Sequence, residues 1–377
     1  MDSLLVVGDI GYRGRVANFV SSGKGILLFN EFIPYIKSST WSMLNLESPV
    51  GDSSLYIKKC GPCISCTNAF VRAIKDAGFT GVTLANNHFY DCGQKGVENT
   101  IRECQVNGLK TVGGGVDLIQ ASKNLILETD NLRITIINVC EQEFSLVSDF
   151  HGGSKHLEPI KQYYEILKAR AEVHYIIIII HGGHEYYQLP SPRMQEVYRF
   201  FIDIGADAVI NHHQHCYSGY EIYKGKPIFY GLGNFCFDSA KNLRNHIWNS
   251  GYAVKLYFDN EKLTFDIIPY IQCNEEVGVR CMSESEKLAF DLKIVNLNEI
   301  IANPSKLGEA FEQYAVSLGD ADFMKPLYNG LTARYYKKKW FPSFLTKKQR
   351  YYQLHFIQNE AHRDTLLIRL KNKLNLR

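Results

Sequence analysis

Six short apolar segments of this chain each end at carboxylate, amide or imidazole side chains, and this arrangement limits both fold and chemistry. Each segment has the length and apolar content of a strand. Ligands of parallel sheets bind beyond the carboxyl ends of the strands, so six polar endings predict one site built from several strands. The segments are Leu4–Val7 with Asp9, Met43–Leu46 with Glu47, Gly81–Ala85 with Asn86, Asn87 and His88, Ile176–Ile180 with His181, Ala208–Ile210 with Asn211, His212, His213 and His215, and Ile228–Leu232 with Asn234.

The polar endings supply enough oxygen and nitrogen donors for a centre of one or two divalent metal ions. His213 and His215 point to the same side if the backbone is extended, whereas a tight loop would direct them to two adjacent metals. Mixed carboxylate, amide and imidazole ligands suit manganese, zinc or iron and do not select among them. The predicted ligands are Asp9, Glu47, Asn87, His181, His213 and His215.

The order of these motifs resembles the CapA family, which is associated with poly-γ-glutamate capsule synthesis within the calcineurin-like metallophosphoesterase superfamily. The resemblance covers about residues 4–270. It implies an α/β fold in which a β-sandwich is flanked by helices (αββα), with a metal pair at the strand ends. The motifs that carry it are Gly8-Asp9, Asn45-Leu46-Glu47, Ala85-Asn86-Asn87-His88, His181–Glu185, His212-His213-Gln214-His215 and Gly231–Phe235.

The resemblance also implies a role for each ligand. Glu47 would bridge two metals, and Asp9 and His215 would complete the first. The superfamily places a further histidine ligand where this chain has Gly11, and an aspartate where it has Glu47. The first metal is therefore expected to be held weakly or to be absent. The second metal would be bound by Asn87, His181 and His213.

Three residues near the ligands are candidates for a catalytic role. His88 would stand where the superfamily keeps its substrate-facing acid, and could protonate a leaving group. A positioned general acid contributes roughly 10²–10⁴-fold to a rate. His184 and Glu185 follow His181 closely and could orient a substrate or a metal ligand.

Four further residues are predicted to bind the substrate. Arg13 and Arg15 follow Asp9 closely and could meet an anionic group. The other two are Asn86 and Asn234, and Asn234 could instead brace the histidine loop through backbone hydrogen bonds. Three neighbours have two open interpretations: Glu141 and Glu143 could face the site or lie in an exposed loop, and His212 could be a metal ligand or could support one.

Strand-like and helix-like segments alternate along the first 275 residues, and helical patterns follow. This predicts a domain at residues 1–275 and a helical, basic and aromatic-rich extension at residues 276–377. Local signals include helix starts at Thr67 and Ser191-Pro192, a helix stop at Gly78, core-facing Val97, Ile101 and Val106, and a hairpin turn at Asp259-Asn260-Glu261.

The net charge of +3 is distributed unevenly along the chain. Residues 331–377 contain 12 Lys and Arg but only Glu360 and Asp364 as acids, and they end in an amphipathic helical pattern. A basic segment favours an anionic partner, so an anionic membrane surface or polymer is one interpretation and a solvated helical subdomain is the other. Nucleic acid is not expected because no binding motif is present.

No apolar segment reaches the ~20 residues of a membrane-spanning helix. Residues 1–3 lack the basic start of a signal peptide. We therefore expect a cytoplasmic protein, with the basic segment able to hold it peripherally at a membrane. Most of the ten cysteines are expected to be reduced, buried thiols. The exception is the run Cys60, Cys63 and Cys66, whose spacing also suits a metal site that lacks an evident fourth ligand.

Two functions follow from these observations. The first is a metal-dependent phosphoesterase-like enzyme of the CapA type, acting on an anionic small molecule or polymer intermediate in capsule or surface-polymer biosynthesis. The alternative is a non-hydrolytic metal-binding scaffold that binds an anionic polymer or a biosynthetic partner. Gly11, in place of a ligand, and the basic segment favour the scaffold.

Overall fold

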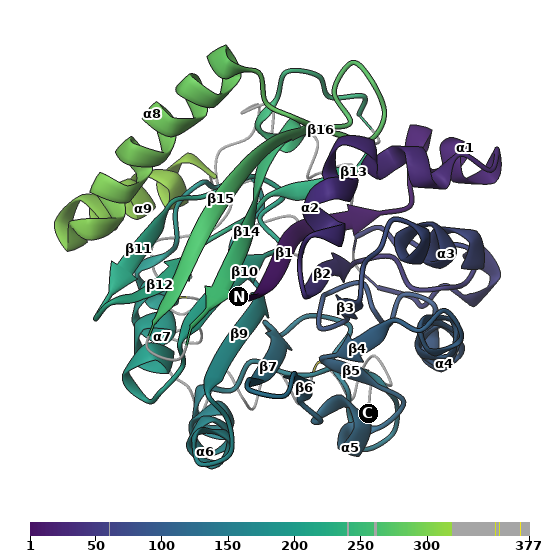
Figure 1. Ribbon diagram of the computed structural model, residues 1–377, viewed down its shortest axis with the longest axis horizontal. Helices are drawn as coiled ribbons and strands as arrows, with labels where there is room; N and C mark the ends of the chain where they lie inside the picture. The colour runs from purple at the N-terminus through teal and green to yellow at the C-terminus, as the bar shows by residue number, and fades with distance from the viewer. Residues whose placement is uncertain are drawn as a thin grey trace. The chain divides into compact units, whose positions relative to one another are not determined.

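Two β-sheets form the centre of the larger of two units into which the chain divides, Met1–Gly308 and Glu309–Arg377 (Figure 1). The computed structural model describes residues 1–59, 61–239, 241–259 and 262–318, with Tyr351, Leu354 and Leu370. Some sequence predictions fall on residues outside this description. They concern Cys60, two residues of the expected hairpin turn, Asn260 and Glu261, and the basic segment 331–377 apart from Tyr351, Leu354 and Leu370.

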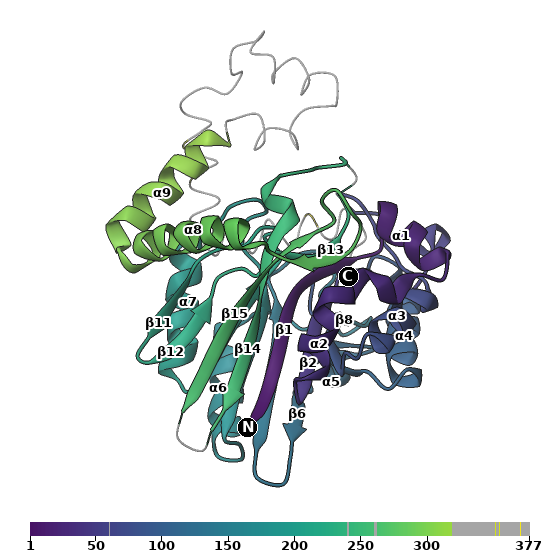
Figure 2. The same ribbon diagram turned by 45° about the horizontal axis from the view of Figure 1, so that its top comes forward.

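The first sheet is mixed, and its parallel part carries the N-terminal polar endings. Its order is β16-β15-β14-β1-β2-β3-β4, with β13 paired to β1. Strands β1 to β4 and β13 run parallel, whereas β14, β15 and β16 run antiparallel (Figure 2). The strands are β1 Asp2–Gly11, β2 Trp41–Leu46, β3 Gly81–Thr83, β4 Lys110–Val112, β13 Asn234–Phe237, β14 Ser250–Phe258, β15 Leu263–Gln272 and β16 Val279–Cys281.

The second sheet carries the histidine endings. Its order is β11-β12-β10-β9-β7-β6, with β7, β9, β10 and β12 parallel. A separate two-stranded sheet pairs β5 Gly114–Gly115 with β8 Gly153–Ser154. The six strands are β6 Leu125–Glu128, β7 Arg133–Cys140, β9 Tyr175–His181, β10 Ala208–His212, β11 Tyr220–Tyr223 and β12 Lys226–Phe229.

The two sheets pack through aromatic side chains of their facing surfaces. Tyr175 of β9 lies 5.2 Å from Phe258 of β14, and Phe229 of β12 lies 5.1 Å from Phe265 of β15. Strand β1 is buried on both faces. Of its apolar residues, Leu5 and Val7 belong to the cluster that includes helix α3. The opposite side chains of a strand must then face the second sheet, which explains the uninterrupted apolar run.

Helices cover the outer face of each sheet, so the predicted αββα arrangement is confirmed. Helices α1, α3 and α4 pack on the first sheet, while α6 and α7 contact the second. The helices are α1 Gly14–Ser21, α2 Ile33–Lys37, α3 Asn68–Asp76, α4 Gly93–Val106, α5 Leu118–Ala121, α6 Pro159–Arg170, α7 Pro192–Asp203, α8 Glu284–Ala302 and α9 Pro304–Ser317, with short 3₁₀ turns η1 Gly25–Phe32, η2 Ser53–Leu55 and η3 Ile247–Asn249.

Helix α8 extends the larger unit beyond the boundary expected at residue 275. Its Phe290 lies 5.0 Å from the ring of Tyr217 and 5.9 Å from that of Tyr252. Asn298 accepts a hydrogen bond from the backbone of Tyr220 at 2.7 Å. These contacts attach α8 to the edge of the second sheet, so the compact unit continues to Gly308.

Several local expectations can be compared with the structure. Ser191 caps α7, with its hydroxyl accepting a hydrogen bond from Met194, and Gly78 ends α3 with φ +105°. Thr67 occupies the N-cap position of α3, as expected, although its side chain makes no capping hydrogen bond. One expectation was wrong: Val106, the last residue of α4, is 76% exposed.

Candidate metal centre

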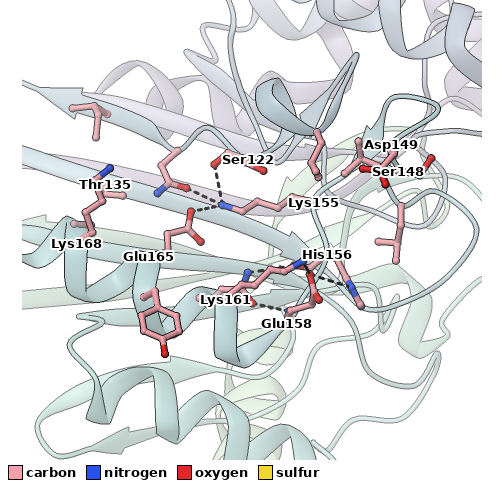
Figure 3. A pocket seen from close by; sticks show the side chains of 18 of the residues that line it. Ser122, Thr135, Ser148, Asp149, Lys155, His156, Glu158, Lys161, Glu165 and Lys168 are labelled. Atoms are coloured by element: carbon pink, nitrogen blue, oxygen red, sulfur yellow. Dashed lines mark hydrogen bonds and ion pairs between the residues drawn. The ribbon is translucent and has the colours of Figure 1, made fainter. Parts of the chain in front are cut away.

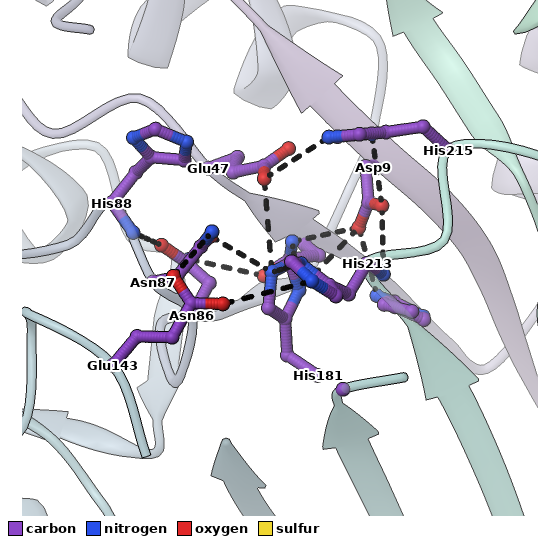
Figure 4. Close-up of polar contacts among 12 residues, drawn as sticks. Asp9, Glu47, Asn86, Asn87, His88, Glu143, His181, His213 and His215 are labelled. Carbon is purple, nitrogen blue, oxygen red and sulfur yellow. Dashed lines mark hydrogen bonds and ion pairs between the residues drawn. The ribbon is translucent and has the colours of Figure 1, made fainter. Parts of the chain in front are cut away.

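Strand pairing places the polar endings of both sheets around one point (Figure 4). Asp9 lies opposite Asn45 of β2 and Asn234 of β13, and His181 lies opposite His212 of β10. The sixth segment differs from its prediction, because β12 ends at Phe229 and Asn234 instead begins β13. Asn234 still reaches the site, since β13 runs parallel to β1 at the level of Asp9.

Two groups of three buried donors are close enough to hold a metal ion. In each group one ligand atom per residue lies within 4.8 Å of the others. The second-metal group contains Glu47, His181 and His213, and the first-metal group contains Asp9, Glu47 and His215. Glu47 is the residue shared by both groups.

The loop after β10 is tight, which distinguishes between the two arrangements considered for its histidines. His213 has φ +90° and His215 has φ +54°, in the left-handed region that non-glycine residues rarely adopt. Such backbone costs of order 1–3 kcal/mol per residue and is concentrated at functional sites. The two rings consequently enter different donor groups instead of pointing to the same side.

Glu47 is the clearest indication that these residues fit a cation. Both of its carboxylate oxygens are buried, and none of the described residues hydrogen-bonds to them. Oε1 lies 3.7 Å from Nε2 of His181 and 3.8 Å from Nε2 of His215, too far for hydrogen bonds. Burial and the charge of Asp9 raise its pKa well above the usual value. A buried carboxylate without partners is costly unless a cation accompanies it.

Asp9 has the opposite environment. Burial alone would raise its pKa, but the hydrogen bond with His212 lowers the pKa overall. Asn45 donates to Oδ1 at 2.7 Å, and the backbone of His213 donates to Oδ2 at 3.1 Å. Asp9 is therefore held as a carboxylate. Nδ1 of His212 lies 3.3 Å from Oδ1 of Asp9, so His212 supports a predicted ligand and belongs to neither donor group.

His181 lies at the centre of the second-metal group. Its Nε2 is 3.0 Å from Nδ1 of His213 and 3.1 Å from Oδ1 of Asn87, and its Nδ1 is 3.2 Å from Asn45. Burial lowers the pKa of His181 well below its usual value. It is therefore a neutral imidazole, which is the form that binds metals.

His215 is oriented by Asn234. Nδ1 of His215 lies 2.9 Å from Oδ1 of Asn234, whose Nδ2 donates back to the carbonyl of His215 at 3.1 Å. Because an amide oxygen only accepts, Nδ1 carries the proton and Nε2 keeps its lone pair facing Glu47. The sequence allowed two roles for Asn234, binding substrate or bracing the histidine loop, and these two hydrogen bonds brace the loop.

Asn86 and Arg15, both predicted to bind substrate, are engaged in structural contacts. Asn86 donates to Asn45 and to the carbonyl of Leu46, and accepts from the backbone of His88. Arg15 forms an ion pair with Asp238 at 3.0 Å and donates to the carbonyls of residues 273–275. The amide of Asn86 and the guanidinium of Arg15 are therefore both bonded to other groups of the protein.

The remaining predicted residues lie around the cluster. Arg13 is half-buried near Tyr186, and its charge partly offsets the burial that raises the pKa of that tyrosine. Burial lowers the pKa of His184. Glu185 is exposed, and its negative charge helps to raise the pKa of Glu47. His88 is drawn with the cluster in Figure 4, and its backbone donates to Oδ1 of Asn86 at 3.1 Å.

Asn45 was not predicted as a site residue, and Glu143 was left open between the site and an exposed loop. Asn45 joins Asp9 to His181, and its signal was a polar residue inside an apolar strand. Glu143 accepts from Nδ2 of Asn87 at 3.2 Å and lies 3.7 Å from His213, so of its two interpretations the structure favours the one in the site. Glu141 lies beside the site, where it accepts from the backbone of Gly183 and pairs with Arg193.

Phe237 occupies the space beside Gly11, where the first-metal group would need another ligand. A Cβ at Gly11 would lie 2.4 Å from Cε2 of Phe237. The ring of Phe237 also packs against those of His215 and Trp248, at 5.4 Å and 5.3 Å. The first-metal group therefore has three donors, with Phe237 closing its fourth side next to Gly11, whereas Oδ1 of Asn87 lies 3.1 Å from Nε2 of His181 in the second group.

Replacing Gly11 should test this packing. Gly11→Ala is expected to lower the free energy of unfolding by about 1–3 kcal/mol, because the methyl group cannot fit without moving Phe237. Urea denaturation followed by fluorescence would measure the change. Gly308→Ala is the control, since nothing lies within 4 Å of a Cβ there. Equal midpoints for the Gly11→Ala variant and the unaltered protein would contradict the close contact.

A cavity of about 790 Å³ between α6 and the loop at residues 146–149 is separate from this cluster (Figure 3). None of the predicted ligands lines it. Its buried lysine, Lys155, already contacts the carbonyl of Ser122 at 3.3 Å, Asn124 at 3.0 Å and the carboxylate of Glu165. The cavity therefore offers no free buried cation in the part of the chain that the structure describes.

The described cysteines are all free thiols, as expected. Cys66 donates to the carbonyl of Ser48 at 3.1 Å, and burial raises its pKa well above the usual value. Neither of the two metal-binding groups found among the described residues contains a cysteine. Among the described helices, none is both long and apolar enough to cross a membrane.

Comparison with known proteins gives a family match over most of the larger unit. The family model described as bacterial capsule synthesis protein PGA_cap matches residues 3–239. The capsule biosynthesis protein CapA of Bacillus anthracis is 30% identical over 71% of this chain and 66% of its own length. The PGA biosynthesis protein CapA of Bacillus subtilis is 31% identical over 62% of this chain and 63% of its own length. The alignments thus span just under two thirds of these relatives.

Solved structures resemble the chain more distantly. A novel phosphatase from Mycoplasma pneumoniae has a TM-score of 0.47 at 13% identity, covering 73% of this chain and 95% of that one. A hypothetical protein from Thermus thermophilus has a TM-score of 0.46 at 12% identity, covering 71% of this chain and 98% of that one.

Proposed function

Because the chain belongs to the bacterial capsule synthesis protein family PGA_cap, we propose that it is a metal-dependent phosphoesterase-like enzyme of surface-polymer biosynthesis. Membership confirms the resemblance to the CapA family. The observation that carries the enzymatic part is Glu47, a buried carboxylate without hydrogen-bonding partners among the described residues, shared by two groups of donors. The substrate would be an anionic intermediate of a capsule or related polymer, poly-γ-glutamate or polysaccharide.

Two sets of residues would hold divalent ions. Glu47, His181, His213 and Asn87 would hold one divalent ion, and Asp9 and His215 would contribute to a second. A divalent cation held there supplies positive charge toward a phosphoryl oxygen and lowers the pKa of bound water.

As an imidazolium, His88 would hold a proton at Nε2 for the leaving oxygen, while its Nδ1–H donates to Asp91 at 2.6 Å. Asn86 would fix the turn that carries Asn87 and His88, since its Oδ1 accepts from the backbone of His88 at 3.1 Å. Arg13, half-buried near Tyr186, would meet the anionic part of the substrate.

An assay with p-nitrophenyl phosphate and bis(p-nitrophenyl) phosphate in the presence of Mn²⁺ or Zn²⁺ would test the proposal. We expect Asp9→Ala to reduce kcat with either substrate by at least about 10²-fold, and His88→Ala to cause a similar loss with an alkyl phosphate, whose leaving oxygen needs the proton that a positioned acid supplies. His174→Ala is the control, because His174 is exposed and lies outside the cluster. Turnover that is absent with either metal, or equal in all variants, would contradict an enzymatic role.

A scaffold that binds an anionic polymer without hydrolysis is the second candidate. The observation that favours it is the closed fourth side of the first-metal group, where Phe237 lies against Gly11. A single metal ion can bind a polymer carboxylate or phosphate without activating water for attack. This candidate predicts metal binding without turnover in the same assay, and unchanged metal binding in His88→Ala.

A further inference from the structure

The segment that precedes α3 brings one lysine to the side of His88. Lys59 has a side chain only 4% exposed and forms an ion pair with the fully buried carboxylate of Asp91. The same carboxylate accepts from the backbone of Ile64 at 2.8 Å, and the carbonyl of Asp91 accepts from the backbone of Ile57 at 2.9 Å. Ile57, Lys59 and Ile64 thus all contact Asp91.

Asp91 in turn fixes the ring of His88. Its Oδ2 lies 2.6 Å from Nδ1 of His88, three residues earlier in the chain. An ionised carboxylate can only accept, so Nδ1 carries the proton and Nε2 is the nitrogen available to a substrate. The ammonium of Lys59 lies 3.3 Å from the same Nδ1, and because that nitrogen already donates to Asp91 this contact is electrostatic.

The ammonium of Lys59 is the cation paired with the buried carboxylate of Asp91. A buried carboxylate that loses its partner is strongly destabilised, and it relaxes by turning toward water or by taking up a proton. Either change would remove the short hydrogen bond that orients His88. The segment carrying Lys59 lies far from His88 in the sequence, so the lysine acts as a separate clamp.

We propose that Lys59 is a positioning residue, which holds Asp91 and thereby directs Nε2 of His88 toward the leaving group. The proposal rests on the proposed function in one respect, namely that His88 donates a proton. A purely structural role for Lys59 would instead stabilise the loop at residues 57–64. The two roles differ in how the rate depends on the leaving group, because only an expelled alkoxide requires a proton.

The kinetic test compares Lys59→Met with Lys58→Met, whose side chain belongs to an exposed neighbour. With p-nitrophenyl phosphate, whose leaving group departs without a proton, Lys59→Met should keep kcat within a few-fold of the unaltered protein. With an alkyl phosphate, kcat should fall by at least about 10-fold more while KM changes little. Equal losses for both substrates would overturn the positioning role.

A second measurement does not require activity. In ¹H–¹⁵N spectra of the imidazole groups, the Nδ1 proton of His88, assigned with His88→Gln, should be shifted downfield by the short hydrogen bond. The signal should disappear in Lys59→Met and persist in Lys58→Met. Lys59→Gln replaces Lys59→Met if the latter does not fold. An unchanged signal would overturn the proposal, whereas a lost signal in a protein without turnover supports the clamp and contradicts the enzymatic role.

Discussion

The variant His181→Ala/His213→Ala should bind its tighter divalent ion at least about 100-fold more weakly than the unaltered protein, because it lacks two ligands of one group. The two rings are separated by 3.0 Å between nitrogens and belong to the same donor group as Glu47. Loss of a single supporting contact to a metal ligand already costs roughly 10–100-fold in affinity, so loss of two ligands should cost more. Mass spectrometry of metal content after dialysis, with titration against a chelating dye, would measure the change.

A matched control removes two histidines outside the cluster. His156→Ala/His174→Ala changes the same number of imidazoles, and neither residue belongs to a donor group. Its metal content should equal that of the unaltered protein. If the His181→Ala/His213→Ala protein also kept its metal, the second-metal group would be wrong.

Glu47→Gln should change stability in opposite directions with and without metal. Burial and neighbouring carboxylates raise the pKa of Glu47, so ionisation of this group increasingly disfavours the metal-free folded protein as the pH rises. Replacing it should make the metal-free protein more stable by about 1–3 kcal/mol. The unaltered protein should gain about 2.7 kcal/mol from Mn²⁺ at a concentration about 100 times Kd, and Glu47→Gln much less.

The pH dependence gives the sign of this effect. The folded pKa of Glu47 lies above its unfolded value near 4.5, so its contribution favours folding below that pH and opposes folding as the pH rises. In EDTA, the gain in the free energy of unfolding of Glu47→Gln over the unaltered protein should therefore be small at about pH 4.5 and grow toward about pH 8. Thermal unfolding of both proteins, with exposed Glu196→Gln as control, measures it. If Glu47→Gln in EDTA were less stable than the unaltered protein at about pH 8, the conclusion that the Glu47 carboxylate lacks a partner would be wrong.

The sequence allowed the site to be located because its ligands follow strands. Asp9, His181 and the histidine loop each come at the end of a parallel strand, and parallel strands end on one edge of a sheet. The two-sheet fold was implied by the family resemblance that the motif order carries. Strand ends were less certain, as the shift of Asn234 to the start of β13 shows.

Contacts from outside the strand ends could not be predicted in the same way. Lys59 and Glu143 reach the site from irregular loops, where no periodicity indicates which side chain points inward. Phe237 appeared as an ordinary core residue, and only the structure shows its ring against Gly11. Asn86 and Arg15 carried polar groups suited to a substrate, but internal partners far along the chain engage them.

Diffraction from crystals grown with Mn²⁺, collected at the manganese absorption edge, tests the account most directly. The account predicts a strong anomalous peak within bonding distance of Glu47, His181 and His213, and a weaker peak or none beside Asp9 and His215. A protein without a peak beside Glu47, or with its only strong peak away from both donor groups, would contradict the metal centre.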